Sequence, residues 1–214
     1  MIKLDILSDP ICPWCYIGKA GLDRALEARP DHPFSVEWHP FQLNPEMPRE
    51  GIDRRAYLEA KFGGKENAVA VYARIAEAAE AAGLALNLEA IERTPNTIDA
   101  HRLIHWAAVE GRQTAAVSRL FRAYFEAGCD IGEKGVLLDI AEGIGLERDV
   151  IARLLESDAD IAEIRARETH ARKRGVTGVP TFVVANRHVR PGAQPTELWT
   201  QTLDEIDARI RAAE

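Results

Sequence analysis

The 214-residue sequence predicts an α/β fold that is interrupted by a large, all-helical insertion. Strand patterns occur near the start of the chain, at Ile2–Leu7 and Phe34–Trp38, and return only near its end, at Thr181–Val184. Helical periodicity fills most of the chain between them, from about Arg54 to Arg174. The two strand-bearing segments must therefore meet in space to form one sheet.

The elements follow one another in a clear order. The first strand stops at Ser8-Asp9-Pro10, and a helical pattern runs from about Pro13 to Pro30. The second strand ends at His39-Pro40 and a loop follows. In the helical part, Asn96 can cap a helix that Gly111 ends.

The end of the chain predicts a hairpin and a helix. Asn186-Arg187 has the composition of a turn between two short strands. Pro195 is expected to begin the last helix. Its inward face is expected to hold Trp199, Leu203, Ile206 and Ile210.

The composition narrows the classes of partner. The chain is 46% hydrophobic, which suffices for a core, and its net charge of -7 gives no overall attraction for nucleic acid or anionic lipid. The opening MIKLDILSD lacks the continuous apolar run of a signal peptide, and no segment approaches the ~20 apolar residues that span a bilayer. We therefore expect a cytoplasmic protein without nucleic-acid or membrane partners.

Two of the three cysteines form the motif Cys12-Pro13-Trp14-Cys15. The spacing puts the first sulfur at a helix start, where backbone N–H groups and the helix dipole stabilise a thiolate. Cys12 would attack a substrate disulfide and Cys15 would resolve the mixed disulfide, or the same steps would run backwards. Pro13 and Trp14 are expected to tune the stability of that thiolate.

Two other interpretations of the cysteine pair stay open. One is an inert buried pair, and the other is half of a zinc site, which usually needs four ligands. His101 and His105, four residues apart on one predicted helix, would complete a tetrahedral set with the two cysteines. Cys129 has no near partner in the sequence and is expected to be structural or prone to oxidation.

A second motif lies about 165 residues later, in the segment Gly175-Val176-Thr177-Gly178-Val179-Pro180-Thr181-Phe182. Pro180 stands at the first residue of a predicted strand, where its missing N–H costs least. An X-Pro bond in such a turn can be cis, although an ordinary trans proline is the commoner case.

The two motifs together resemble the thioredoxin superfamily and, within it, the DsbA-like family. The segments SDPICPWCYIG, WHPFQLNP, TPNTIDAHRLIHWA and GVTGVPTFVV are similar to a cytosolic, polyketide-biosynthesis-associated branch. The resemblance implies a thioredoxin-like fold in which the Val179-Pro180 bond is cis and faces the cysteines. The backbone of Val179 would pair with an extended substrate or with glutathione.

The same resemblance includes enzymes with different chemistry. Hydroxychromene carboxylate isomerases and kappa-class glutathione transferases share the fold, and in them a serine commonly replaces the first cysteine and activates glutathione. This chain has Cys12 and keeps Cys15, which favours disulfide chemistry.

Several further residues are candidates for the substrate-binding site. Thr181 adjoins the proline. Asn96 and His101 lie in a region that covers the site in the related families. One of His101 and His105 could hold a proton near neutral pH beside Cys12. Gln194 precedes the last helix, whose start suits a carboxylate such as that of glutathione. His39 would lie in a loop near the site. A basic cluster of Arg165, Arg167, Arg172, Lys173 and Arg174 is expected to be a solvated helix face or to attract glutathione.

The sequence thus predicts a single domain over residues 1–210, with thioredoxin-like segments 1–45 and 172–212 and a helical insertion at 46–171. We expect a thiol-disulfide oxidoreductase with no tightly bound cofactor and no metal. Its partner would be a disulfide or dithiol substrate, with glutathione as a redox partner or co-substrate. The alternatives are a glutathione-dependent isomerase or transferase, and a zinc-binding or interaction module that uses Cys12 and Cys15.

Overall fold

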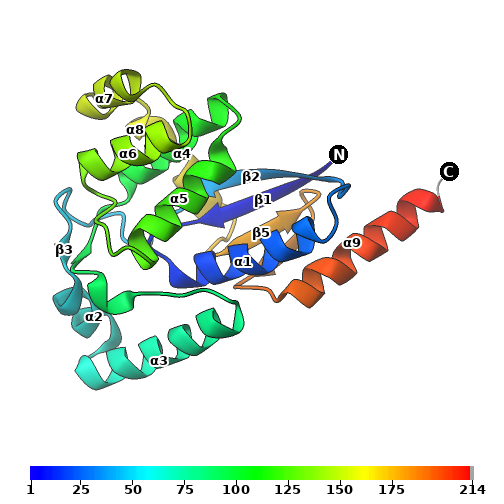
Figure 1. Ribbon diagram of the computed structural model, residues 1–214, viewed down its shortest axis with the longest axis horizontal. Coiled ribbons are helices and arrows are strands. Elements are labelled where there is room, and N and C mark those ends of the chain that lie inside the picture. The colour runs from blue at the N-terminus through cyan, green and yellow to red at the C-terminus, as the bar shows by residue number, and fades with distance from the viewer. Residues whose placement is uncertain (213–214) are drawn as a thin grey trace.

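The computed structural model, in which residues 1–212 are described, contains a four-stranded sheet of order β2-β1-β5-β6 (Figure 1). The central strand β1 (Ile2–Ser8) is parallel to β2 (Phe34–Pro40) and antiparallel to β5 (Thr181–Val184). β6 (His188–Pro191) pairs with β5 and forms an edge. The expected meeting of the two distant segments in one sheet is therefore confirmed, as is the thioredoxin-like fold with its helical insertion.

The alternation of side chains along β1 decides which layer covers each face. Leu4 and Ile6 are fully buried in the main core, together with residues of α1 (Pro13–Glu27) and α9 (Thr196–Arg211). In Figure 1, α1 crosses in front of the sheet. Lys3, Asp5 and Leu7 point to the opposite face, beside α8 (Ile161–Lys173).

The insertion is almost entirely helical. It contains α2 (Arg54–Phe62), α3 (Lys65–Ala81), the 3-10 turn η1 (Leu88–Ala90), α4 (Ile98–Val109), α5 (Gln113–Phe125), α6 (Lys134–Gly143) and α7 (Arg148–Glu156). It also contains β3 (Ile52–Asp53) and β4 (Arg93–Thr94), an antiparallel pair that the sequence did not predict. Two residues are too few to show the alternation by which a strand is recognised.

Two boundaries differ from the sequence-based expectation. The expected end of the insertion, between residues 171 and 172, falls inside α8, which is one continuous helix packed against β2 and α4. The cap of α4 is Thr97, whereas the neighbouring Asn96 accepts the N–H of Ile98 through its side chain at 3.0 Å.

Aromatic packing joins the insertion to the sheet-bearing part. The ring of Tyr16 on α1 stacks on Phe121 of α5, with centroids 5.0 Å apart. The indole N–H of Trp38 on β2 donates to the Thr114 hydroxyl of α5 at 3.0 Å. Because α5 contacts both the strand and the helix of the first segment, it holds their junction in place.

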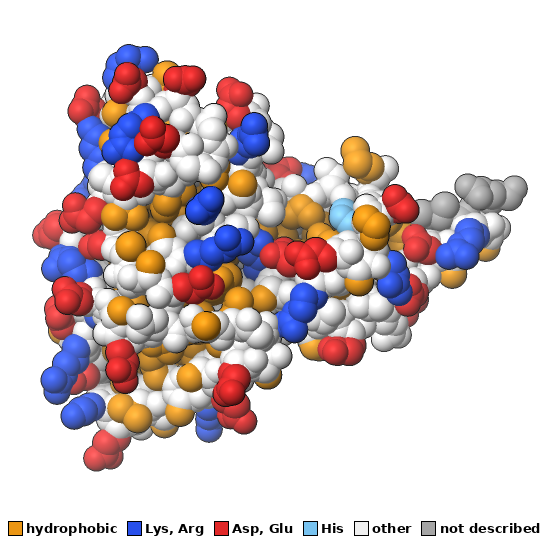
Figure 2. All heavy atoms as spheres, viewed as in Figure 1, with side chains coloured by type: hydrophobic (Ala, Val, Ile, Leu, Met, Phe, Trp, Pro, Cys, Tyr) orange, Lys and Arg blue, Asp and Glu red, His pale blue; other side chains and the backbone are white. Residues whose placement is uncertain are grey.

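Acidic and basic side chains are mixed over the face that carries α1 (Figure 2). Within residues 1–212, no helix is long and apolar enough to cross a membrane.

In α9, Trp199 and Leu203 are buried and Ile206 packs partly against the core, as expected. The side chain of Ile210 lies outside the described part of the structure, so its inward orientation stays a prediction.

Candidate functional site

The cysteine motif lies at the junction between β1 and α1, as the sequence predicted. Cys12 is the N-cap of α1 and Pro13 is its first residue, where the absent N–H leaves no helix bond unmade. The carbonyl of Asp9 accepts the N–H of Cys12 at 2.9 Å, and the carbonyl of Cys12 accepts that of Cys15 at 3.0 Å. One turn of helix thus brings the two cysteines to 3.4 Å from each other.

Both cysteines of the motif are recessed, and a residue between them is exposed. Cys12 is 3% exposed and Cys15 is 1% exposed, whereas Trp14 between them is 38% exposed. Burial raises the pKa of the Cys15 thiol well above its ordinary value, and the neighbouring Cys12 raises it further. Cys15 is therefore protonated at neutral pH, which suits a cysteine that acts second.

The late motif faces the cysteines. The Val179-Pro180 peptide bond is cis, as expected. The thiol of Cys12 donates to the carbonyl oxygen of Val179, with 3.6 Å between sulfur and oxygen. Thr181 fixes the same turn, because its hydroxyl donates to the carbonyl of Gly178 at 2.8 Å. The turn therefore presents its backbone directly beside the sulfur of Cys12.

Two glycines of α1 allow this close approach. A Cβ at Gly18 would lie 3.3 Å from the ring of Pro180, and one at Gly21 would lie 2.6 Å from the carbonyl oxygen of Gln194. Any larger residue at Gly21 would push the helix away from the segment that follows the proline turn. The relative position of the two motifs thus depends on these small residues.

A buried carboxyl next to the motif was missed by the sequence analysis. Asp9 is 0% exposed, and its side chain accepts the N–H groups of Leu43 at 2.6 Å and Ile11 at 3.3 Å. Burial raises the pKa of Asp9 to about 7. An acidic residue between a buried strand and a cysteine motif is a signal that could have pointed to it.

The structure corrects the expectation for His101. This side chain is 2% exposed, and its Nε2 lies 3.9 Å from the Asp9 carboxyl without a hydrogen-bond partner among the described residues. Burial lowers the pKa of His101 to about 3, and the charge of Arg167 lowers it further. His101 is therefore neutral near pH 7 and is not the histidine that holds a proton beside Cys12.

The four residues of the zinc alternative do not form a ligand group in the part of the chain that the structure describes. His105 lies instead with Asp160 and Glu163. Both of these acids lie at the start of α8.

The side-chain amides of Asn96 and Gln194 already make hydrogen bonds within the protein. Asn96 donates to the carbonyl of Met47 at 2.6 Å and accepts from Gln42 at 3.2 Å. Gln194 donates to the carbonyl of Pro191 at 2.8 Å. Contacts of either amide with a substrate would require these bonds to be exchanged, and both roles stay predictions.

The expected basic cluster is divided by the rotation of α8. Arg172 lies over the ring of Phe41, 4.0 Å from its centroid, and donates to the carbonyl of Gln42. Arg167 faces β2, where its guanidinium donates to Nδ1 of His39 at 3.0 Å. Arg165, Lys173 and Arg174 are exposed, as expected for a solvated face.

The sequence pattern of the DSBA-like thioredoxin domain matches residues 3–204. The chain belongs to the DsbA-like thioredoxin family. Members of this family carry out thiol or disulfide chemistry, and the described site has the cysteine pair that such chemistry requires.

Relatives of this DsbA-like protein support the assignment. A crystal structure described as a probable DsbA oxidoreductase of Streptomyces coelicolor is 34% identical, with a TM-score of 0.85 over 96% of this chain and 89% of that one. The uncharacterised protein YwbO of Bacillus subtilis is 26% identical over 95% of this chain and 96% of its own length.

More distant structures show the same fold. A 2-hydroxychromene-2-carboxylate isomerase has a TM-score of 0.77 at 15% identity and covers 99% of both chains. The cytosolic disulfide reductase DsbM of Pseudomonas aeruginosa, solved with GSH, has a TM-score of 0.68 at 18% identity, over 98% of this chain and 99% of that one. The fold therefore serves both redox and isomerase chemistry, as the resemblance implied.

Proposed function

We propose that this DsbA-like protein is a thiol-disulfide oxidoreductase in which Cys12 is the nucleophile and Cys15 resolves the mixed disulfide. The observation that carries the proposal is the pairing of two recessed cysteines, 3.4 Å apart, with the cis Val179-Pro180 turn beside Cys12. The raised pKa of Cys15 supports the division of roles, because the group that is harder to ionise acts second.

The reaction balances without a further group. The Cys12 thiolate attacks one sulfur of the substrate disulfide, that S–S bond breaks, and the other substrate sulfur leaves as a thiolate. Cys15 then gives its proton to the substrate thiolate that has left, or to water, and attacks the sulfur of Cys12, so that the second substrate sulfur leaves as a thiolate. Two electrons pass from the cysteine pair to the substrate, and the reverse sequence oxidises a dithiol.

The Val179 turn is proposed to hold the substrate backbone. When Cys12 ionises, its thiol no longer donates to the carbonyl of Val179, which can then accept an N–H from an extended substrate. Thr181 keeps the turn in place through its bond to Gly178. Pro13 and Trp14, at the start of α1, are proposed to tune the thiolate.

We further propose that the cysteine pair is the only redox group and that no cofactor is tightly bound. Glutathione is proposed as the partner that recycles it, and the cytoplasm as its location. The suggestion of glutathione draws on the GSH bound to the reductase DsbM and on a motif that needs only thiol exchange. The suggestion of the cytoplasm draws on the description of DsbM as cytosolic.

A reduction assay tests the proposal. Reduced protein is expected to reduce insulin and hydroxyethyl disulfide, and Cys12→Ser is expected to abolish both activities. Cys129→Ser is the matched control, since Cys129 lies outside the motif, and it should retain them. Full activity of Cys12→Ser would disprove the assignment of the nucleophile. Turnover of a hydroxychromene substrate with glutathione, without disulfide reduction, would favour the isomerase alternative instead.

A further inference from the structure

A groove with a volume of about 1240 Å³ lies on the side of the sheet opposite to α1. Its floor is β1, at Lys3, Asp5 and Leu7. One wall is α8 and the other is the β5–β6 hairpin. A groove of this size exceeds the ~300–1,000 Å³ of typical small-molecule pockets, which favours a polymer as its occupant.

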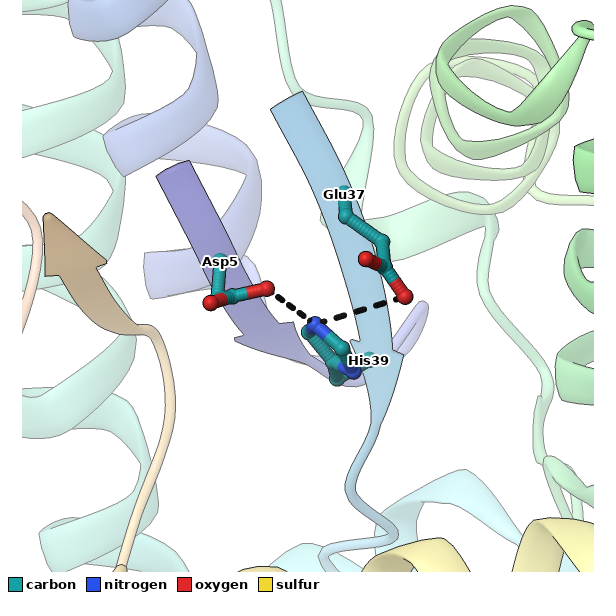
Figure 3. A group of neighbouring side chains, drawn as sticks. All are labelled: Asp5, Glu37 and His39. Atoms are coloured by element: carbon teal, nitrogen blue, oxygen red, sulfur yellow. Dashed lines mark hydrogen bonds and ion pairs between the residues drawn. The ribbon is translucent and has the colours of Figure 1, made fainter. Parts of the chain in front are cut away.

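The carboxylates inside the groove are already neutralised. Figure 3 shows Asp5 and Glu37, on neighbouring strands, turned toward the ring of His39. Lys3 lies 3.0 Å from Asp5 and 2.9 Å from Glu37, and Arg167 lies 3.4 Å from Glu37. The two acids thus have close cationic neighbours and leave little negative charge for a ligand.

The cationic side chains at the rim of the groove, unlike those inside it, have no ion-pair partner among the described residues. Arg174 follows α8 and Arg187 lies in the β5–β6 turn, and both are exposed on the two walls of the groove. Neither has a carboxylate within ion-pair distance among the described residues. The lining therefore holds four lysine and arginine side chains against two paired acids, in a chain whose net charge is -7. This local excess of positive charge attracts an acidic ligand.

The groove continues from the reactive turn. Its lining includes Gly178, Val179 and Pro180, and the carbonyl of Val179 contacts the thiol of Cys12. From Leu7 to Lys3 the floor extends for ~13 Å, the length of about five extended residues. At the outer wall, all four residues of β6 are exposed, so its edge can pair with an added strand.

We propose that this groove binds an acidic, extended segment of a polypeptide substrate, next to the cysteine that reacts with Cys12. The inference rests on the proposed function and adds the substrate class: proteins with acidic residues within about five positions of the reacting cysteine. Cys12 is only 3% exposed, which suits an extended segment better than a folded surface.

Binding is measured without redox chemistry, on Cys12→Ser/Cys15→Ser protein. The probes are peptides of about ten residues in which a serine replaces the reacting cysteine. Several aspartates lie on the N-terminal side of that serine in one peptide and on its C-terminal side in another. In the control peptides, asparagines replace the aspartates. We expect the aspartate peptide to bind more tightly, and its advantage to fall as salt is added. Reversal of both rim charges, Arg174→Glu/Arg187→Glu, should weaken aspartate-peptide binding about tenfold.

The matched control is Arg74→Glu/Arg119→Glu, which changes the net charge equally at exposed residues of α3 and α5, outside the groove. It should leave peptide binding nearly unchanged. Equal binding of the aspartate and asparagine peptides, or equal loss in the control, would overturn the proposal. So would a rim-charge reversal that alters only self-association in sedimentation, since the occupant would then be a second copy of the chain. Hydroxyethyl disulfide reduction by the native protein separately tests the oxidoreductase function.

Discussion

The sulfur of Cys12 lies 3.6 Å from the carbonyl oxygen of Val179, although 167 positions separate the two residues in the sequence. This contact joins the two strand-bearing segments at the point where the chemistry is proposed to occur. It requires the β1–β5 pairing, the cis turn and the close approach of α1 to the loop that precedes α9. Four predictions follow from the residues that maintain or adjoin it.

The first concerns the ionisation of Cys15. In Cys12→Ser/Cys129→Ser protein Cys15 is the only thiol, since the chain has three cysteines. Because burial raises its pKa, the thiolate should be nearly absent at pH 7 and should form only above the ordinary value of ~8.5. Ultraviolet absorbance of the thiolate measures this without requiring a reagent to reach the sulfur. Full ionisation near pH 7 would contradict the assigned roles, and unfolded protein provides the reference curve.

The second concerns Asp9 and His101, which should give opposite pH dependences of stability. The pKa of Asp9 is raised from 3.8 to about 7, so its contribution is complete below its ordinary pKa and is lost as the pH rises toward 7. The pKa of His101 is lowered from 6.5 to about 3, so its contribution is complete above 6.5 and is lost as the pH falls. Between these limits the two effects oppose each other.

Substitutions should separate these effects. In Asp9→Asn the free energy of unfolding should rise with pH relative to the parent, and in His101→Gln it should fall, each by up to ~1.4 kcal/mol per pH unit between pH 4 and 6.5. Urea denaturation at a series of pH values measures both curves. Variant curves parallel to the parent curve would show that neither group titrates as described.

The third prediction is that Gly21→Ala destabilises the protein. Alanine favours a helix over glycine by up to ~1 kcal/mol, but its Cβ would lie 2.6 Å from the carbonyl oxygen of Gln194. Relief of that overlap should cost about 1–3 kcal/mol and lower the rate of disulfide reduction, because α1 carries the cysteines. Gly135→Ala, in α6 and with open space around it, is the control and should be neutral or stabilising. Thermal unfolding of both variants measures this difference in stability, and equal stability of the two would contradict the prediction.

The fourth prediction concerns the hydroxyl of Thr181. Thr181→Val removes its bond to the carbonyl of Gly178 and should cost about 1–2 kcal/mol in stability. Because the turn that presents Val179 is then less fixed, reduction of insulin should slow further than the loss of folded protein explains. Thr200→Val, which removes a comparable 3.0 Å bond within α9, should affect stability alone. Equal activity per folded molecule in the two variants would argue against a positioning role for Thr181.

The sequence by itself determined the cysteine pair, the order of the four strands of the main sheet and of the helices around them, and the proline turn. These features are local, because the hydrophobic repeat of a strand, that of a helix and the CxxC spacing each involve residues close together in the sequence. It also predicted that the early and late strands share a sheet, since neither could be buried alone.

Only the tertiary structure decided what surrounds those elements. The displaced pKa values of Asp9 and His101 depend on burial by distant segments, and the charge of Glu168 on α8 acts on Asp9 across 159 positions of the sequence. No local pattern records such neighbours. The division of the basic residues of α8 between Phe41, His39 and the groove depends on the rotation of that helix on the sheet. Charge and burial are properties of neighbours in space, whereas a motif is a property of neighbours in the chain.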